Sequence, residues 1–189
     1  MMPIERMRLE DFDAVFRLLS QSFPAGERRD AAGQRALLSD SAYRVDILRA
    51  PSGGVQAMMA WWDFDDFVFF EHFAVDPACR SGGIGGQMLD ALLARYDKPA
   101  CLEAELPETE LAARRIGFYE RCGMVLNRYF YMQPAITAGR HAIPLYLMTQ
   151  NAPVDETEFF RLRDLLYRRV YRLDVSDPLF CKKTAVKKP

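Results

Sequence analysis

The sequence predicts an α/β (α+β) fold in which a mixed sheet carries helices on both faces. Strand-like and helix-like segments follow one another in the order β-α-α-β-β-β-α-β-α-β-β-α along the 189 residues. Half of the residues are hydrophobic, which is enough for one ordinary core. We therefore expect a single domain over residues 1–189.

The first half of the chain reads as two helices and four strands. A short strand within residues 3–12 leads into a helix capped near Asp11 or Asp13, since acidic residues favour helix starts. "PSGG" separates two apolar runs and indicates a hairpin. The remaining segments are a helix at 28–40 and strands at 43–50, 54–64 and 67–77.

The second half of the chain also reads as alternating helices and strands, without an internal repeat. Apolar residues at helical spacing follow a glycine-rich loop, and they are Met88, Leu89, Leu92, Leu93 and Tyr96. A strand at 100–106 precedes a helix at 108–123 that Gly123 ends. Strands at 124–133 and 143–150, a surface loop around 137–142 and an amphipathic helix at 155–172 complete the order.

Composition excludes several functional classes. The 25 basic and 26 acidic residues give a net charge of −1, which argues against nucleic-acid binding. No apolar run approaches the roughly 20 residues of a membrane span, so we expect no membrane partner. Four scattered cysteines indicate a reduced, cytoplasmic protein, and the two histidines lack the spacing of a metal site. The basic segment 182–189 is expected to be a disordered tail.

The segment "RSGGIGGQML", Arg80–Leu89, places four glycines in five positions directly before a helix. A P-loop would need Gly-Lys-Ser/Thr at its end, and a dinucleotide fingerprint would need a third glycine at Met88. The pattern Arg/Gln-x-x-Gly-x-Gly/Ala does fit from Arg80 to Gly85. In it, backbone amides at a helix N-terminus converge on a diphosphate, which a side chain at Gly83 or Gly85 would push away.

The segment "FFEHFAVDPACRSGGIGGQMLDALL" resembles the cofactor-binding motif of the GNAT superfamily of N-acetyltransferases, which have the acyl-CoA N-acyltransferase fold. The downstream "ARRIGFYERCGM" resembles the second motif of that family, with Met124 where phenylalanine is usual. The resemblance covers about residues 3–149 and leaves the helix at 155–172 as an addition. It implies a mostly antiparallel, splayed sheet.

The resemblance also implies acetyl-CoA as cosubstrate and no metal. The diphosphate would lie on Arg80, Ser81, Gly82, Gly83, Ile84, Gly85 and Gly86. The backbone of Phe73, Ala74 and Val75 would pair with the pantetheine arm at the splay.

Tyr119 lies at the position where the family places a phenol near the thioester sulfur. A phenol of pKa near 10 could protonate the departing thiolate or donate a hydrogen bond to it. The alternative is a tyrosine that only packs at the end of its helix.

The base that deprotonates the amine remains open between Glu71 and Glu103, with Glu105 on the same face as Glu103. Period-2 alternation predicts that Glu71 shares a face with Phe73 and Val75, and that His72 packs on the opposite face. An apolar cleft would raise the pKa of such a carboxylate and suit it to this role. Pairing of these carboxylates with Arg114 or Arg115 is the structural alternative.

The sequence thus predicts a cytoplasmic N-acetyltransferase that moves an acetyl group from acetyl-CoA to a primary amine, without an acyl-enzyme. The alternatives are a non-catalytic acyl-CoA sensor with this fold, and a scaffold whose glycines only form a turn. The acceptor is expected to be a small molecule of unspecified identity, and the protein a monomer or homodimer.

Overall fold

The structure is a computed structural model, and it describes residues 4–80, 82–136, 139 and 141–181. Ser81 of the predicted diphosphate loop, and the predicted tail at 182–189, lie outside the described residues. The chain forms two compact units, Met1–Cys101 and Leu102–Pro189. The expectation of a single domain stays a prediction.

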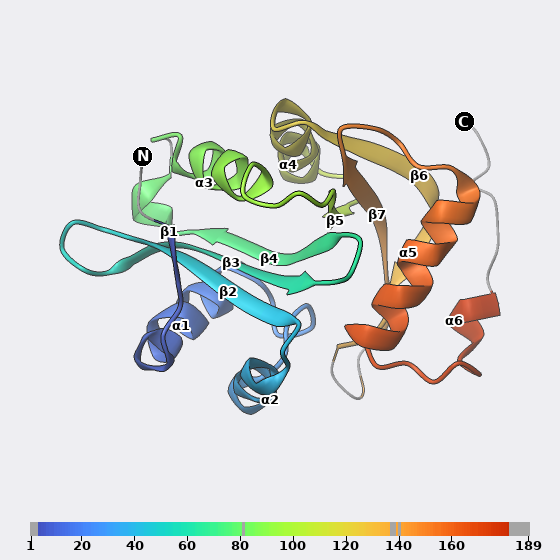
Figure 1. Ribbon diagram of the computed structural model, residues 1–189, viewed down its shortest axis with the longest axis horizontal. Helices are drawn as coiled ribbons and strands as arrows, with labels where there is room; N and C mark the ends of the chain where they lie inside the picture. The colour runs from blue at the N-terminus through green and yellow to red at the C-terminus, as the bar shows by residue number, and fades with distance from the viewer. Residues whose placement is uncertain (1–3, 81, 137–138, 140, 182–189) are drawn as a thin grey trace. The chain divides into compact units, whose positions relative to one another are not determined.

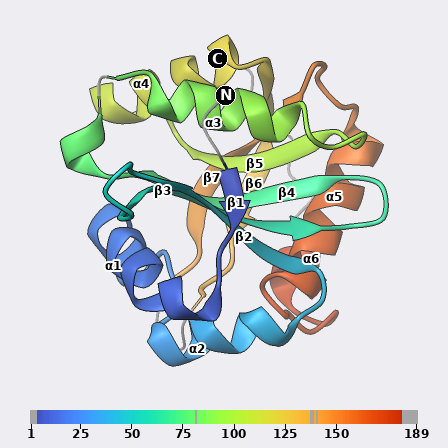
Figure 2. The same ribbon diagram turned by 60° about the vertical axis from the view of Figure 1, so that its left-hand side comes forward.

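The first unit is built on an antiparallel sheet in the order β1-β2-β3-β4. Helices α1 and α2 cover one face of these strands and α3 covers the other (Figures 1 and 2). The bounds are β1 Ile4–Arg6, α1 Phe12–Ser22, α2 Ala31–Ala36, β2 Tyr43–Arg49, β3 Val55–Asp63, β4 Val68–Val75 and α3 Ile84–Leu93, with short 3-10 helices at Leu9–Asp11, Leu37–Ser39 and Pro77–Cys79.

The core of the first unit centres on β3. All residues from Ala57 to Trp62 are buried, so this strand contributes apolar side chains to both layers of helices. The apolar run in the sequence, "AMMAWW", therefore belongs to a strand covered on both faces.

The second unit begins within β5 Ala100–Glu105 and continues with α4 Glu110–Arg121, β6 Met124–Gln133, β7 Ile143–Gln150, α5 Glu156–Arg169 and α6 Pro178–Cys181. Strands β6 and β7 pair antiparallel. Helix α5 packs on β6 through ring contacts between Tyr129 and Phe159 and between Tyr131 and Tyr167. The predicted helix at 155–172 is confirmed as α5, whereas α6 was not predicted.

The complete strand order is β1-β2-β3-β4-β5-β7-β6. A mixed α/β fold with a mostly antiparallel, open sheet flanked by helices is therefore confirmed. The predicted splay between β4 and β5 stays a prediction.

Local sequence signals explain where several helices start and end. The side chains of Asp30, Thr109 and Asp155 each accept a hydrogen bond from a backbone N–H three residues on, at the starts of α2, α4 and α5. Gly123 has a φ of 83° just after α4, as predicted for a helix that ends in the left-handed conformation.

Candidate functional site

The glycine-rich loop leads directly into α3. Gly83 is the residue before the helix and has a φ of 73°, which lies in the left-handed region. The first intrahelical bond of α3 runs from the Gln87 N–H to the Gly83 carbonyl at 3.1 Å. The amides of Ile84, Gly85 and Gly86 therefore lie in the first turn, where backbone N–H groups have no intrahelical acceptor and the helix dipole favours an anion.

Two glycines of this loop differ in what they require. A side chain at Gly83 would be strained by the left-handed backbone alone, whatever lies nearby. A Cβ at Gly86 would meet no described atom within 4 Å apart from its chain neighbours and the backbone of its own helix. Glycine at position 83 is thus explained by backbone geometry, whereas at position 86 the fold alone gives no reason for it.

The segment between β4 and the loop is held by its own contacts. The Arg80 guanidinium donates from Nε to the Val75 carbonyl at 3.2 Å. Phe73, Ala74 and Val75 pair with Met59, Met58 and Ala57 of β3. Ala74 is buried, and the other two are half-buried. The predicted pairing of this backbone with a pantetheine arm stays a prediction.

A β-bulge in β4 corrects the predicted face of Glu71. His72 pairs with Ala60 and Phe70 pairs with Trp61, so Glu71 is an extra residue between them. Alternation restarts after the bulge, and Glu71 does not share the face of Phe73 and Val75. Instead, Glu71 and His72 both contact the segment that joins α1 to α2.

The carboxylate of Glu71 is fully engaged. Arg29 lies 2.6 Å from Oε1, and the Trp62 indole donates to Oε2 at 2.9 Å. The side chain of Glu71 is 1% exposed. Burial raises the pKa of Glu71, but Arg29, His72 and the two hydrogen bonds outweigh it, so this pKa lies below its ordinary value. The expectation of a raised pKa was therefore wrong for Glu71.

His72 was predicted to be a packing residue, and the structure gives it an additional property. Its Nε2 lies 3.0 Å from the Glu27 carbonyl, and its ring packs edge-on against Phe23. Its Nδ1 is buried without a hydrogen-bond partner and lies 4.0 Å from Glu71 Oε2. A histidine next to a glutamate in a mostly apolar strand was the available signal, but the bulge that places both on one face cannot be read from the sequence.

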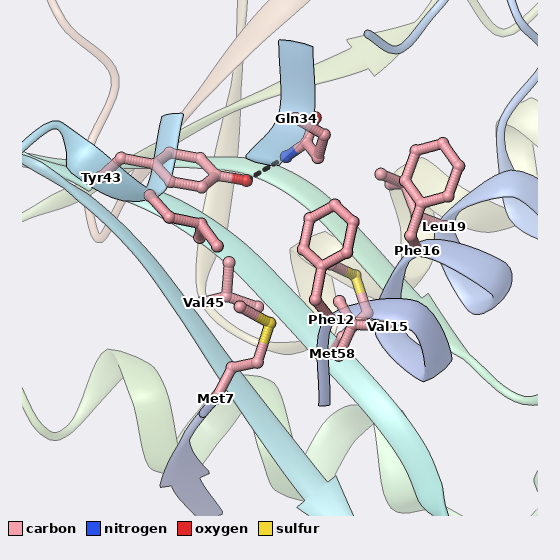
Figure 3. Close-up of a pocket in the computed structure, with 10 residues that line it drawn as sticks. Met7, Phe12, Val15, Phe16, Leu19, Gln34, Tyr43, Val45 and Met58 are labelled. Carbon is pink, nitrogen blue, oxygen red and sulfur yellow. Dashed lines mark hydrogen bonds between the residues drawn. The ribbon is translucent and has the colours of Figure 1, made fainter. Parts of the chain in front are cut away.

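A mostly apolar pocket of about 240 Å³, part of it open to solvent, lies between α1 and strands β2 and β3 (Figure 3). Its polar groups are Gln34 and Tyr43, which are hydrogen-bonded to each other. Burial and Glu71 raise the pKa of Tyr43 well above its ordinary value. The apolar side chains are those of Met7, Phe12, Val15, Phe16, Leu19, Leu38, Val45 and Met58. Such a lining suits packing rather than proton transfer.

In the second unit, Tyr119 lies near the end of α4. Its side chain is buried and its ring packs against Phe118. Burial, with Glu105 and Cys122 adding to it and Arg115 opposing, raises the pKa of Tyr119 to about 12. The phenol therefore keeps its proton at neutral pH and is suited to donate a hydrogen bond.

Glu103 lies at the centre of a hydrogen-bonded cluster in the second unit. Its carboxylate accepts bonds from the Tyr131 and Tyr171 hydroxyls and, at 3.1 Å, from the Gln133 amide. Its neighbour Glu105 pairs with Arg115 at 2.6 Å, as the structural alternative predicted for one of these carboxylates. Both groups are engaged by donors.

Among the residues that the structure describes, no cluster of three histidine, cysteine, aspartate or glutamate side chains could hold a metal ion. The described helices also include none with the length and apolar character that crossing a membrane requires.

Comparison with known proteins gives a consistent family. Residues 44–124 match the acetyltransferase (GNAT) domain. A Bacteroides thetaiotaomicron structure, assigned to the GNAT family of acetyltransferases, is 31% identical with a TM-score of 0.84, and the match covers 92% of this chain and all of that one.

Two other matches are shorter or lower in sequence identity. YjbC of Bacillus subtilis (strain 168), which is named as an acetyltransferase, is 32% identical over 105 residues, or 54% of this chain and about half (52%) of that protein. A Vibrio cholerae spermidine N-acetyltransferase, in complex with CoA and spermine, is 12% identical with a TM-score of 0.58 over 78% of this chain and 94% of that one. The latter likeness shows the fold alone.

Proposed function

The chain belongs to the GNAT family of acetyltransferases, and from that premise we propose that it moves an acetyl group from acetyl-CoA to a primary amine by direct attack in a ternary complex. Membership of the family supports acetyl transfer in general. The donor, the kind of acceptor and the order of events belong to the proposal. The acceptor is proposed to be a small molecule, and the protein to act in the cytoplasm.

The observation that carries the proposal is the start of α3. Left-handed Gly83 turns the chain so that the amides of Ile84, Gly85 and Gly86 form the first turn of the helix. Such amides, together with the helix dipole, bind diphosphate well. The proposal places the diphosphate beside Gly86, where a Cβ would have open space in the structure without ligand.

Tyr119 is proposed to stabilise the leaving group. Because the pKa of this phenol is about 12, it would hold its proton against a thiolate, whose conjugate thiol has a pKa of about 8.5. We therefore favour a hydrogen bond from Tyr119 to the thiolate over complete proton transfer. Much of the rate would come from holding the amine beside an already reactive thioester.

Glu71 and Glu103 remain the sequence-derived proposals for the base. Their contacts weaken both assignments. Glu71 is held ionised by Arg29, and Glu103 accepts from three side chains. Hydrogen bonds to the charged form lower the proton affinity of a carboxylate.

The deciding experiment measures thiol release from acetyl-CoA with each of three amines in turn: spermidine, benzylamine and a peptide with an N-terminal alanine. We expect amine-dependent release and an acetylated amine detected by mass spectrometry. CoA binding without release on any of these amines would instead support the sensor. A protein with no affinity for CoA would contradict both functions and leave the scaffold.

A further inference from the structure

The bulge in β4 creates a buried charged cluster within the first unit. Glu71 and His72 are consecutive residues, yet both face the segment between α1 and α2, where they meet Arg29 and the Glu27 carbonyl. The side chains of Glu71 and His72 are 1% and 3% exposed. Arg29, at 13%, is the most exposed of the three ionisable side chains.

The hydrogen bond of His72 defines its tautomer. A carbonyl oxygen can only accept, so the 3.0 Å contact with Glu27 places the ring proton on Nε2. Nδ1 then carries the lone pair. It is buried and has no hydrogen-bond partner, and such an orphaned group calls for an explanation, which is often a functional one.

The carboxylates that the sequence suggested as bases contrast with this nitrogen. The oxygens of Glu71 accept from Arg29 and Trp62. In the second unit, Glu103 and Glu105 accept from their own donors. Among these groups, Nδ1 of His72 combines basicity with a lone pair that no hydrogen bond occupies.

We propose that His72 is the catalytic base, with Nδ1 as the atom that removes a proton from the acceptor amine and Glu71 as the carboxylate that stabilises the resulting imidazolium. This inference rests on the proposed function. The ammonium form of the amine gives one proton to Nδ1. The freed lone pair attacks the thioester carbon, the new C–N bond forms and the C–S bond breaks. The amide nitrogen loses a second proton as the thiolate gains one, and His72 returns its proton to solvent.

The charges around the ring support this role. Burial lowers the pKa of His72, Arg29 and Arg28 lower it further, and Glu71 opposes them. The net decrease leaves the ring neutral at neutral pH and able to accept a proton. The proposal requires that the amine displace the guanidinium of Arg29, the most exposed of the three ionisable side chains, from Glu71 in order to reach Nδ1.

The first test is NMR of the imidazole groups in the intact protein. The chain has two histidines, and His141 is exposed, so His141→Gln assigns the remaining signals to His72. We expect a proton on Nε2 and a pKa below the ordinary 6.5. A proton on Nδ1 at neutral pH would overturn the inference.

The second test is the pH dependence of kcat/KM, which reports the base in the free enzyme. In the wild type, kcat/KM should rise with pH through the pKa that NMR gives for His72. His72→Gln keeps an N–H donor for the Glu27 carbonyl and should retain CoA affinity. It should lose the rise of kcat/KM with pH and lower kcat/KM about 10²- to 10⁴-fold. His141→Gln should match the wild type.

The outcomes separate the two proposals. Turnover by His72→Gln at the wild-type rate and with the wild-type pH profile would overturn the inference and leave the proposed function standing. Absence of turnover by the wild type with all three amines would overturn the proposed function and this inference with it.

Discussion

A single extra residue in β4 changes the chemistry of the first unit. Without the bulge at Glu71, alternation would separate Glu71 and His72 onto opposite faces. With it, Glu71 meets Arg29 and Trp62, and His72 lies 4.0 Å from Glu71. The pair is buried, so its electrostatic interactions are screened less than those at the surface.

Removing the charge of Glu71 should destabilise the first unit. Glu71→Gln removes the carboxylate charge beside Arg29 in a mostly buried place, which should lower the free energy of unfolding by about 3 kcal/mol. Glu110→Gln breaks the exposed pair of Glu110 with Arg114 and should cost less than about 1 kcal/mol. Urea denaturation followed by tryptophan fluorescence measures both, since the two tryptophans, Trp61 and Trp62, lie in β3. Equal losses of unfolding free energy in the two variants would contradict the expectation that the buried ion pair contributes more than the exposed one.

His72 should make stability depend on pH. Its folded pKa lies below the ordinary 6.5, chiefly because burial disfavours the charged ring. Between that lowered pKa and about pH 6.5, the unfolded chain binds more protons than the folded one. The free energy of unfolding should therefore fall as the pH drops below 6.5 and be independent of this group above it. Denaturation at several pH values should show this for the wild type and His141→Gln, and a smaller fall for His72→Gln.

At the scale of elements, short-range sequence signals set where several helices begin and end. Side-chain caps begin α2, α4 and α5, and left-handed glycines lie before α3 and after α4. The start of α3 combines an ordinary structural demand with an anion-binding geometry. Substitution can separate these two contributions.

Gly83→Ala and Gly86→Ala should have opposite effects on stability. The first forces a Cβ into a left-handed backbone and should cost about 1–2 kcal/mol. The second places alanine in a helix where a Cβ has open space, and should stabilise by up to about 1 kcal/mol. Thermal denaturation without ligand checks this. If Gly86→Ala also weakens CoA binding while it stabilises the protein, the space at Gly86 serves the ligand.

The stability of helix α5 in its packed position should depend on the buried hydroxyl of Tyr171. The hydroxyl of Tyr171, just beyond α5, donates to Glu103 on β5 and accepts from Gln133 on β6. Tyr171→Phe leaves Glu103 short of a donor and should cost about 1–3 kcal/mol. Tyr129→Phe removes a longer bond of 3.3 Å to the Val154 carbonyl and should cost less. Equal losses of stability in chemical denaturation would argue against the Glu103 cluster as a group that holds α5 in place.

At the scale of the whole molecule, charge and family constrain function in different ways. The net charge of −1 offers no long-range field to select an anionic or cationic acceptor. The GNAT family accounts for the order of the elements across both units. We therefore expect the choice of the proposed acceptor to depend on local groups such as the Glu71 and His72 cluster.

CoA should stabilise the folded protein by mass action. At a concentration 100-fold above its Kd, CoA should raise the free energy of unfolding by about 2.7 kcal/mol. Pantetheine lacks the diphosphate and should give a much smaller increase at the same concentration. Thermal shift measurements with both compounds test this, and equal stabilisation would contradict a diphosphate site at α3.

The sequence by itself determined the order of the strands and of helices α1 to α5, several helix ends and the family. Apolar periodicity, capping residues and turn glycines act over a few residues, so they can be read without the fold; Gly123 after α4 and Asp155 before α5 are examples. The two GNAT motifs are contiguous and could be recognised in the same way. The sequence singled out the glycine at position 83 for contact with a diphosphate, which stays a prediction, whereas its left-handed backbone is a finding of the structure.

Only the tertiary structure decided what surrounds the ionisable groups. The register shift opposite Ala60 and Trp61 turned Glu71 toward Arg29, 42 residues away in the chain. It thereby lowered the pKa of Glu71, which was expected to be raised. Such partners come from distant segments, and electrostatic energies depend on distance and burial, which no local pattern of residues contains.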